Sequence, residues 1–240
     1  MRRAALAAAA ALALAGCGGS APDAAAPATV FAAASLTGLV GELMPEARVN
    51  LGGSDELATQ LREGAAADLF LSASARHPEE LHEEGVVDEP VPFATNRLVL
   101  IVPAGEAAIA GLDDVTRPGT RLVVGGEGVP VGDYTRRTLA ALGREDLLDR
   151  VVSNEKDAKG VVGKVALGEA DAGFAYATDA RAAGGRVRAV ELPAHEGVAI
   201  VYAGAVVSAS ARRDEARALL RLLTGPEGRA ALERAGFGLP

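Results

Sequence analysis

Apolar residues recur along most of this chain with one of two spacings, and the spacings predict its secondary structure. Short runs rich in β-branched residues, which predict strands, alternate with segments in which apolar residues recur every three or four positions, which predict helices. A first strand is expected at residues 29–33, and a helix begins at Ser35 and ends before Pro45. This alternation is typical of α/β proteins with largely parallel sheets.

The remaining predicted elements fall into two clusters. In the first cluster, strands are expected at residues 48–51, 67–71 and 96–103, and helices at 55–62 and 78–84. The pattern then restarts, with strands at 120–124, 172–177, 187–192 and 198–207 and helices at 133–142, 145–151, 160–167, 212–223 and 226–234. The two long apolar strands, 96–103 and 198–207, are where the chain is expected to cross between the clusters.

The N-terminal segment departs from this pattern. Two arginines precede an apolar run at residues 4–15, which is too short to cross a bilayer and is typical of a signal peptide, expected at 1–16. The string Leu14-Ala15-Gly16-Cys17 resembles the lipobox of bacterial lipoproteins, which implies cleavage before Cys17 and lipid attachment to it. The alternative is an ordinary secretory signal that is cleaved nearby, so that Cys17, the only cysteine of the chain, is lost with it. Residues 17–28 are then a lipidated cysteine and a flexible tether.

Composition narrows the classes of ligand. The 240 residues are 49% hydrophobic and have room for one large or two small domains. Lysine and arginine number 24 against 32 acidic residues, a net charge of -8, so nucleic acid is not an expected partner. Aromatic residues are 3% of the chain and tryptophan is absent, so stacking platforms for sugars or bases are scarce. A small polar ligand is favoured.

Candidate binding groups lie at predicted helix starts. Ser35 and Ser54 each stand where a strand turns into a helix, and a helix N-terminus offers unpaired N–H donors and a positive dipole end that suit an anion. Either serine alone is more typical of an ordinary N-cap. Residues 128–133 and 157–160 begin two further helices with small residues, where backbone amides can approach a ligand.

Catalytic and metal motifs are not evident. His77, His82 and His195 lack metal-ligand spacing and lie in charged stretches that suggest exposure to solvent. The glycine-rich residues 125–128 lack the lysine and hydroxyl of a phosphate-binding loop, and no GxSxG motif occurs. An enzyme is disfavoured, and no cofactor is expected.

Several segments resemble the molybdate-binding proteins of ABC importers. VFAAASLT at residues 30–37 and AADLFLSA at residues 66–73 resemble two markers of that family, in the same order. The resemblance continues at LATQL (57–61), VPVGDY (129–134), AGFAYATDA (172–180) and TGPEG (224–228), and so covers nearly all of the chain after the tether. It implies a type II periplasmic-binding fold of two α/β lobes joined by a hinge, with lobe 1 at residues 29–104 and 197–240 and lobe 2 at 105–196.

The resemblance also implies a binding site, position by position. Ser35 and Ser54 would donate hydroxyl and backbone N–H groups to the oxyanion, Val131 and Ala158 would donate backbone N–H groups, and Tyr176 would donate its phenol hydroxyl. Tyr176 on its own would be taken for a core aromatic residue. One departure from the family is that a carboxylate follows the second serine; the acidic helix start predicts that this side chain, Asp55, turns outward to solvent.

The expected function is therefore capture of molybdate or tungstate for a membrane permease, by a monomer anchored at the cell envelope. Sulfate is an alternative ligand. Ferric iron is another, with Tyr134, Tyr176, Tyr202 and Asp55 as potential ligands. A secreted hydrolase that uses Ser35 or Ser54 is the alternative from a different class, but no histidine lies beside either serine in the sequence.

Overall fold

A computed structural model describes residues 27–194 and 198–240. The predicted signal peptide, the lipobox cysteine and His195 lie outside these residues. Within them, no helix combines the length and the apolar character needed to cross a membrane.

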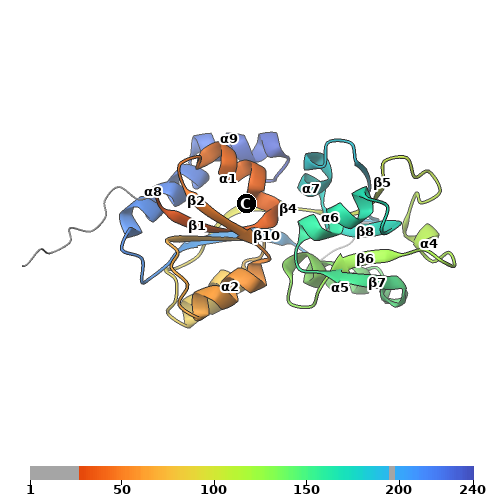
Figure 1. The fold of residues 1–240 in the computed structure, drawn as a ribbon, viewed down its shortest axis with the longest axis horizontal. Coiled ribbons are helices and arrows are strands. Elements are labelled where there is room, and N and C mark those ends of the chain that lie inside the picture. The colour runs from red at the N-terminus through yellow and green to blue at the C-terminus, as the bar shows by residue number, and fades with distance from the viewer. Residues whose placement is uncertain (1–26, 195–197) are drawn as a thin grey trace, which may run out of the picture.

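The first sheet belongs to lobe 1, which contains residues 27–96 and 200–240. Its strand order is β2-β1-β3-β10-β4; β1 runs parallel to β2 and β3, whereas β10 is antiparallel to β3 and β4. The helices α1, α8 and α9 lie on one side of this sheet and α2 on the other (Figure 1). The bounds of the strands are β1 (Thr29–Ala33), β2 (Arg48–Gly52), β3 (Leu69–Ser72), β4 (Val91–Asn96) and β10 (Ile200–Val206), and those of the helices are η1 (Ala34–Leu36), α1 (Thr37–Leu43), α2 (Ser54–Arg62), α3 (Arg76–Glu83), α8 (Arg213–Thr224) and α9 (Pro226–Ala235).

The second sheet belongs to lobe 2, residues 98–190, and repeats this arrangement. Its order is β7-β6-β8-β5-β9; β6 runs parallel to β7 and β8, and β5 is antiparallel to β8 and β9. The bounds are β5 (Leu98–Pro103), α4 (Leu112–Val115), β6 (Leu122–Gly125), α5 (Pro130–Ala141), η2 (Glu145–Arg150), β7 (Val151–Glu155), α6 (Ala158–Ala166), β8 (Ala172–Tyr176), α7 (Ala177–Ala182) and β9 (Val187–Val190).

The central strands are apolar because helices cover both faces of each sheet. Leu69, Phe70 and Leu71 on β3 have no exposed surface, and full burial of one such side chain contributes about 1.5–3 kcal/mol. The largest cluster of buried apolar residues includes Leu71 of lobe 1 and Leu122 of lobe 2, so it extends across both lobes. The two lobes are therefore packed against each other in this structure.

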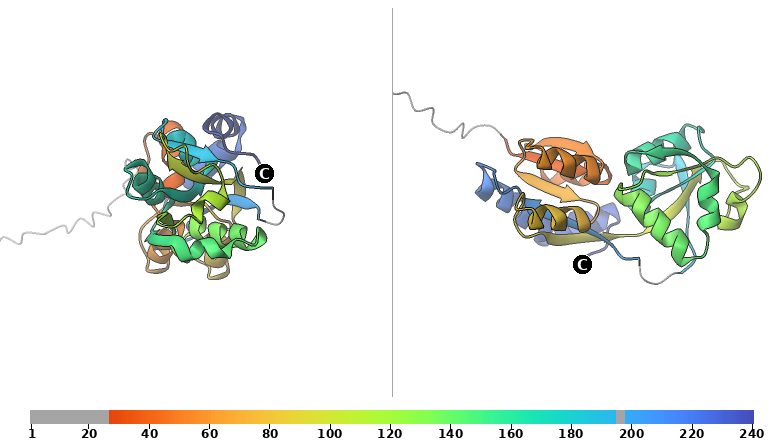
Figure 2. Two further views of the ribbon diagram at one scale, coloured as in Figure 1. Left: turned by 90° about the vertical axis from the view of Figure 1, so that its right-hand side faces the viewer. Right: turned by 90° about the horizontal axis from the view of Figure 1, so that it is seen from below.

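The chain crosses between the lobes at Arg97. Asn96 pairs with Ile200 in the first sheet, whereas Leu98 pairs with Tyr176 in the second. The boundary predicted at residue 104 is therefore wrong: the apolar run 96–103 is not one strand of lobe 1, because its pairing partner changes at Arg97 and β5 lies in lobe 2. The chain re-enters lobe 1 beside this crossing, because Ile200 pairs with Asn96, and the two lobes lie side by side along the length of the molecule (Figure 2).

Candidate functional site

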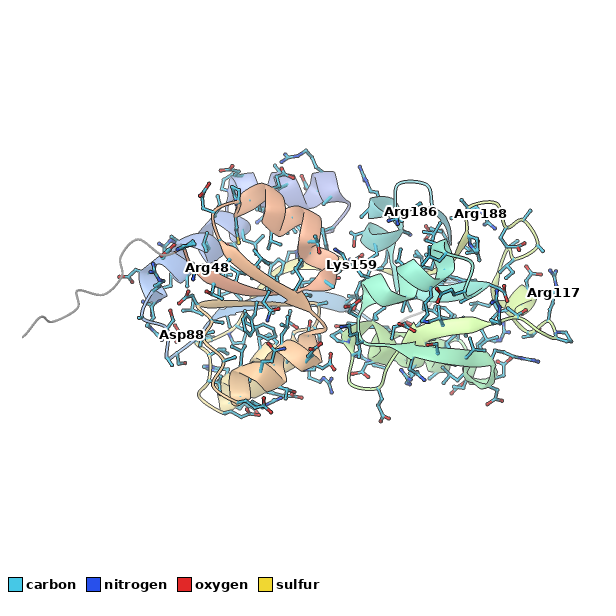
Figure 3. The ribbon with its side chains drawn as sticks, in the orientation of Figure 1. Arg48, Asp88, Arg117, Lys159, Arg186 and Arg188 are labelled. Carbon is cyan, nitrogen blue, oxygen red and sulfur yellow. The ribbon has the colours of Figure 1, made fainter. Side chains whose placement is uncertain are left out.

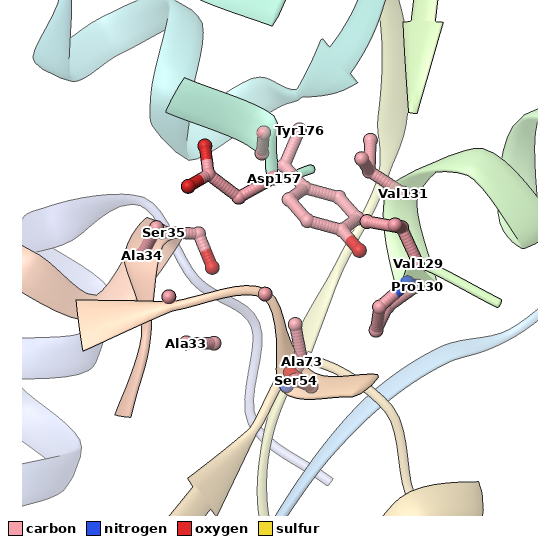
Figure 4. Close-up of a pocket in the computed structure, with 13 residues that line it drawn as sticks. Ala33, Ala34, Ser35, Ser54, Ala73, Val129, Pro130, Val131, Asp157 and Tyr176 are labelled. Carbon is pink, nitrogen blue, oxygen red and sulfur yellow. Dashed lines mark hydrogen bonds between the residues drawn. The ribbon is translucent and has the colours of Figure 1, made fainter. Parts of the chain in front are cut away.

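A small cavity lies between the two lobes. All five residues that the sequence placed in a binding site line it: Ser35, Ser54, Val131, Ala158 and Tyr176. Figure 4 shows these segments converging from both lobes. The cavity is completed by Ala33, Ala34, Gly52, Gly53, Ala73, Val129, Pro130 and Asp157.

The topology of the sheets explains why these residues meet. In each lobe, the first strand of the parallel set lies between the second and the third, and ligands of open α/β sheets bind beyond the carboxyl ends of the strands at such a point. Ser54 is the first residue of α2, Ala158 is the first residue of α6, and Tyr176 ends β8. The first N–H groups of a helix have no acceptor within it, so the cavity is bordered by free backbone donors.

Ser54 is held with its hydroxyl proton available. Its side chain is 1% exposed, and its Oγ accepts a hydrogen bond from the backbone N–H of Ala73 at 3.0 Å. Because this bond uses the oxygen as an acceptor, the hydroxyl is left to donate its proton to a ligand.

Ser35 is oriented by a chain of polar groups that the sequence did not predict. Its Oγ lies 3.1 Å from the hydroxyl of Tyr202. The side-chain amide of Asn96, beside the crossing point, donates to that phenol oxygen at 3.3 Å and to Thr178 Oγ1 at 2.9 Å. With the amide as donor to Tyr202, the phenol can donate to Ser35, and the serine proton is then free to enter the cavity.

Tyr176 carries a buried hydroxyl that has no hydrogen-bond partner in the described part of the chain. The residue is 1% exposed, its hydroxyl points into the cavity (Figure 4), and its ring makes edge contacts with Tyr134 and Tyr202, at centroid distances of 6.5 and 5.7 Å. Burial raises the pKa of the Tyr176 phenol well above its usual value, so the group is a neutral donor. An unsatisfied buried polar group costs about 1–3 kcal/mol, a cost that a ligand oxygen in the cavity would remove.

The backbone donors of lobe 2 are fixed by tight local packing. A Cβ atom on Gly132 would lie 2.3 Å from the carbonyl oxygen of Gly125, so only glycine allows the start of α5, which carries Val131, to rest on the end of β6. Asp157 caps α6 by accepting the N–H of Gly160 at 2.8 Å, which orients the helix start at Ala158.

The donors around the cavity are uncharged. None of its described lining residues is a lysine or an arginine, and Asp157 is the one acid among them. Lys159 follows Ala158 but lies on the lobe 2 side of a neighbouring cavity that Asp179 also lines (Figure 3).

Asp55 does not have the outward orientation expected from the sequence. Its Oδ1 is buried without a hydrogen-bond partner, and the residue does not line the cavity. The carboxylate turns back over Gly53, where the carbonyl of Lys156 from lobe 2 also approaches. Packing of lobe 2 on this helix start therefore overrides the solvent exposure that the neighbouring acidic residues suggested.

The expectation that the histidines face solvent is wrong for His77. This side chain is 4% exposed, and burial, with a smaller effect of Arg76, lowers its pKa. His82 is exposed, and its Nδ1 lies 3.2 Å from the carbonyl oxygen of Val87. In the segments that the structure describes, no three His, Cys, Asp or Glu side chains are grouped so that they could hold a metal ion.

Two α/β lobes that enclose a small cavity of neutral donors at the carboxyl ends of their strands define a two-lobe solute-binding protein. The chain belongs to the bacterial extracellular solute-binding protein family, whose model matches residues 12–238. It is 38% identical over 222 residues to the molybdate-binding protein ModA of Mycobacterium tuberculosis, covering 88% of this chain and 84% of the relative. It is 30% identical over 226 residues to ModA of Escherichia coli, covering 87% and 88%.

The same fold occurs in a solved structure. The periplasmic molybdate-binding protein of Azotobacter vinelandii superposes with a TM-score of 0.77 at 21% identity, over 89% of this chain and 99% of that one. The predicted two-lobe periplasmic-binding fold is confirmed.

Proposed function

We propose that the protein is the substrate-binding component of an ABC importer for molybdate or tungstate. The observation that carries this proposal is the buried, unpartnered hydroxyl of Tyr176, which points into the same cavity as the free hydroxyl of Ser54. The relatives named as molybdate-binding proteins support molybdate as the ligand. No cofactor is needed, because the expected step is binding and delivery.

The proposed donors are sufficient in number and kind. Ser35, Ser54, Val131, Ala158 and Tyr176 would donate hydroxyl or backbone N–H groups, and each hydrogen bond to a charged ligand contributes about 1.5–3 kcal/mol. Several such bonds reach the ~8 kcal/mol of a micromolar complex after the costs of association. A site made only of hydrogen-bond donors has no acceptor for a proton on the ligand, so phosphate species that carry a proton are disfavoured. Sulfate is smaller than molybdate and should bind less well if the lobes close to a fixed distance.

The structure does not favour the alternatives. An iron site would need acidic or histidine ligands grouped beside the tyrosines, whereas the described residues contain no three His, Cys, Asp or Glu side chains placed to hold a metal ion, and Asp55 does not line the cavity. A hydrolase would need a base on its serine, whereas the partner of Ser35 is Tyr202 and that of Ser54 is the N–H of Ala73. Membership of a solute-binding family also argues for binding rather than catalysis.

A thermal-shift panel tests the proposed ligand directly. A ligand that binds only the folded protein raises its melting temperature, so molybdate and tungstate should each raise it at concentrations well above their Kd. Sulfate, phosphate and ferric citrate are the comparison ligands. Stabilisation by ferric citrate alone, or by none of the five, would overturn the proposal.

We further propose that the protein acts as a monomer attached to the cell envelope through a lipid on Cys17, where it delivers its ligand to a membrane permease. The support is the lipobox-like string before Cys17 and membership of an extracellular family. In the native host, Cys17→Ser should move the protein from the membrane fraction to the soluble fraction. A wild-type protein that is soluble and carries no lipid by mass spectrometry would contradict the anchor.

A further inference from the structure

The two lobes make a very close contact at Gly53. A Cβ atom built on this residue would lie 2.4 Å from the carbonyl oxygen of Lys156, which belongs to lobe 2, and 2.7 Å from Oδ1 of Asp55. Real Cβ atoms do not approach other atoms so closely. The backbone angles of Gly53, φ -64° and ψ 139°, are open to any residue. Glycine is therefore needed here for the approach of lobe 2 and not for the local conformation.

The contact joins the segments that carry two of the proposed donors. Gly53 immediately precedes Ser54 in lobe 1, and Lys156 is separated from Ala158 only by Asp157 in lobe 2. Ser54 and Ala158 both line the cavity. The distance at which Gly53 meets Lys156 therefore helps to fix the distance between donors on opposite sides of the cavity.

We propose that Gly53 determines the width of the closed cleft, because its missing side chain lets lobe 2 approach until the Lys156 carbonyl rests against the Gly53 backbone. This inference rests on the proposed function, since the width matters only if an oxyanion is held between the lobes. Packed atoms resist further approach steeply, so the contact acts as a fixed limit. The cleft is then matched to one size of anion by a residue that contributes no side-chain hydrogen bond.

The substitution Gly53→Ala tests this role. The added methyl group cannot coexist with the Lys156 carbonyl at its present position, and a backbone carbonyl cannot turn away as a flexible side chain can. The lobes should therefore stop further apart, and donors on one side should lose contact with the anion. Loss of one hydrogen bond to a charged ligand corresponds to about ten- to a hundredfold weaker binding, which is the expected effect on molybdate. The melting temperature without ligand should change little.

Gly126→Ala is the matched control. A Cβ atom on Gly126 would lie 3.5 Å from Val129 Cγ2 and 3.6 Å from the carbonyl oxygen of Glu155, the residue before Lys156. Both are ordinary contacts within lobe 2. The affinity of Gly126→Ala for molybdate, measured by calorimetry, should equal that of the wild type. Small-angle X-ray scattering at saturating molybdate should show full compaction for wild type and Gly126→Ala and incomplete compaction for Gly53→Ala.

Asp55 requires a separate arm, because its carboxylate is also close to the added methyl group. Gly53→Ala should weaken binding equally when it is introduced into an Asp55→Ala background. If the effect disappears there, the carboxylate is the obstacle and the role of Lys156 is wrong.

Three further outcomes decide the matter. If the wild type binds molybdate and Gly53→Ala has the same affinity and the same compaction, this inference is wrong but the proposed function stands. A fall in the ligand-free melting temperature of Gly53→Ala, without any change in compaction, would make Gly53 a folding residue and also overturn it. Failure of the wild type to bind molybdate would instead defeat the proposed function.

Discussion

Arg76 of lobe 1 and Asp133 of lobe 2 form an ion pair between the lobes, with Nη2 and Oδ2 2.9 Å apart. The same arginine nitrogen donates to the carbonyl of Gly128 at 3.0 Å, and Asp133 accepts the N–H of Gly128 at 2.9 Å. The guanidinium group of Arg76 thus binds Gly128 and Asp133, which are already joined by their own hydrogen bond within lobe 2. Both charged side chains are partly exposed, 49% and 28%, so salt can screen the pair.

The first prediction concerns this pair. Asp133→Asn keeps an acceptor for Gly128 but removes the charge, so the closed form is weakened while lobe 2 is unchanged. Because exposed ion pairs contribute at most about 1 kcal/mol, molybdate should be released about two- to fivefold faster, which stopped-flow measurements can resolve. The difference from wild type should shrink as salt is added. Glu80→Gln is the control, since Glu80 is a partner of Arg76 within lobe 1 at 3.9 Å; an equal effect of this variant would contradict an inter-lobe role.

The second prediction separates the two serines. Ser35→Ala and Ser54→Ala should each weaken molybdate binding about ten- to a hundredfold, corresponding to one hydrogen bond to a charged ligand. Ser54→Ala should also lower the melting temperature of the ligand-free protein, because the N–H of Ala73 loses its acceptor. Calorimetry and melting curves provide the two measurements, with Ser208→Ala, outside the cavity, as the control. Unchanged affinity in both cavity variants would refute their assignment as donors.

The third prediction concerns Tyr176. Tyr176→Phe keeps the ring and its edge contacts while it removes a hydroxyl that has no partner in the described protein. Affinity for molybdate should therefore fall about tenfold or more, whereas the ligand-free melting temperature should hold or rise. Tyr134→Phe is the matched control, because Tyr134 contacts the same ring but does not line the cavity. A loss of folding stability as large as the loss of affinity would make Tyr176 a core residue.

The fourth prediction concerns Asp179, which is buried and has one oxygen without a partner in the described chain. Burial raises the pKa of this carboxyl from 3.8 to about 7; the Tyr176 backbone N–H and Lys159 lower it, and Asp157 raises it. At pH values between 3.8 and about 7, Asp179 is protonated in the folded protein but has lost its proton in the unfolded chain. The contribution of Asp179 to stability is therefore present at low pH and is lost as the pH rises through about 7.

Asp179→Asn should remove this loss, so the variant should melt higher than wild type at pH 8 and show a smaller difference at pH 5. His77 acts with the opposite sign, because its pKa is lowered by burial and its contribution grows as the pH rises. His77 is common to both proteins, so comparing the variant with wild type at each pH isolates Asp179. Equal pH dependence of the two melting curves would show that this carboxyl does not titrate there.

The helix starts of the site were predictable from the sequence, because small and hydroxyl residues mark the turns from strands into helices. The run 96–103 was predicted as a strand of lobe 1 but is β5 of lobe 2, since hydrophobicity records burial and not the choice of partner strand, and the preceding strand β4 was not predicted. β7 was also missed: it lies at the edge of its sheet, and its half-exposed residues are largely polar.

The rest of the site depends on contacts between distant segments. Tyr202 reaches Ser35 across 167 positions of sequence, and nothing local distinguishes it from a core tyrosine. The approach of Lys156 to Gly53 and the inward turn of Asp55 exist only when the lobes are packed together. No pattern within one segment can encode them.

The insertion of β10 between β3 and β4 has a consequence for the order in which the chain can fold. A polypeptide emerges N-terminus first during its synthesis, and domains fold as units as they become complete. Lobe 2 is one uninterrupted stretch, so all of its strands are present before Ile200–Val206 is made. Until then, β3 and β4 lack the strand that joins them, and their edges offer unpaired N–H and carbonyl groups to other chains. A truncated chain should therefore keep a folded lobe 2 beside an aggregation-prone lobe 1.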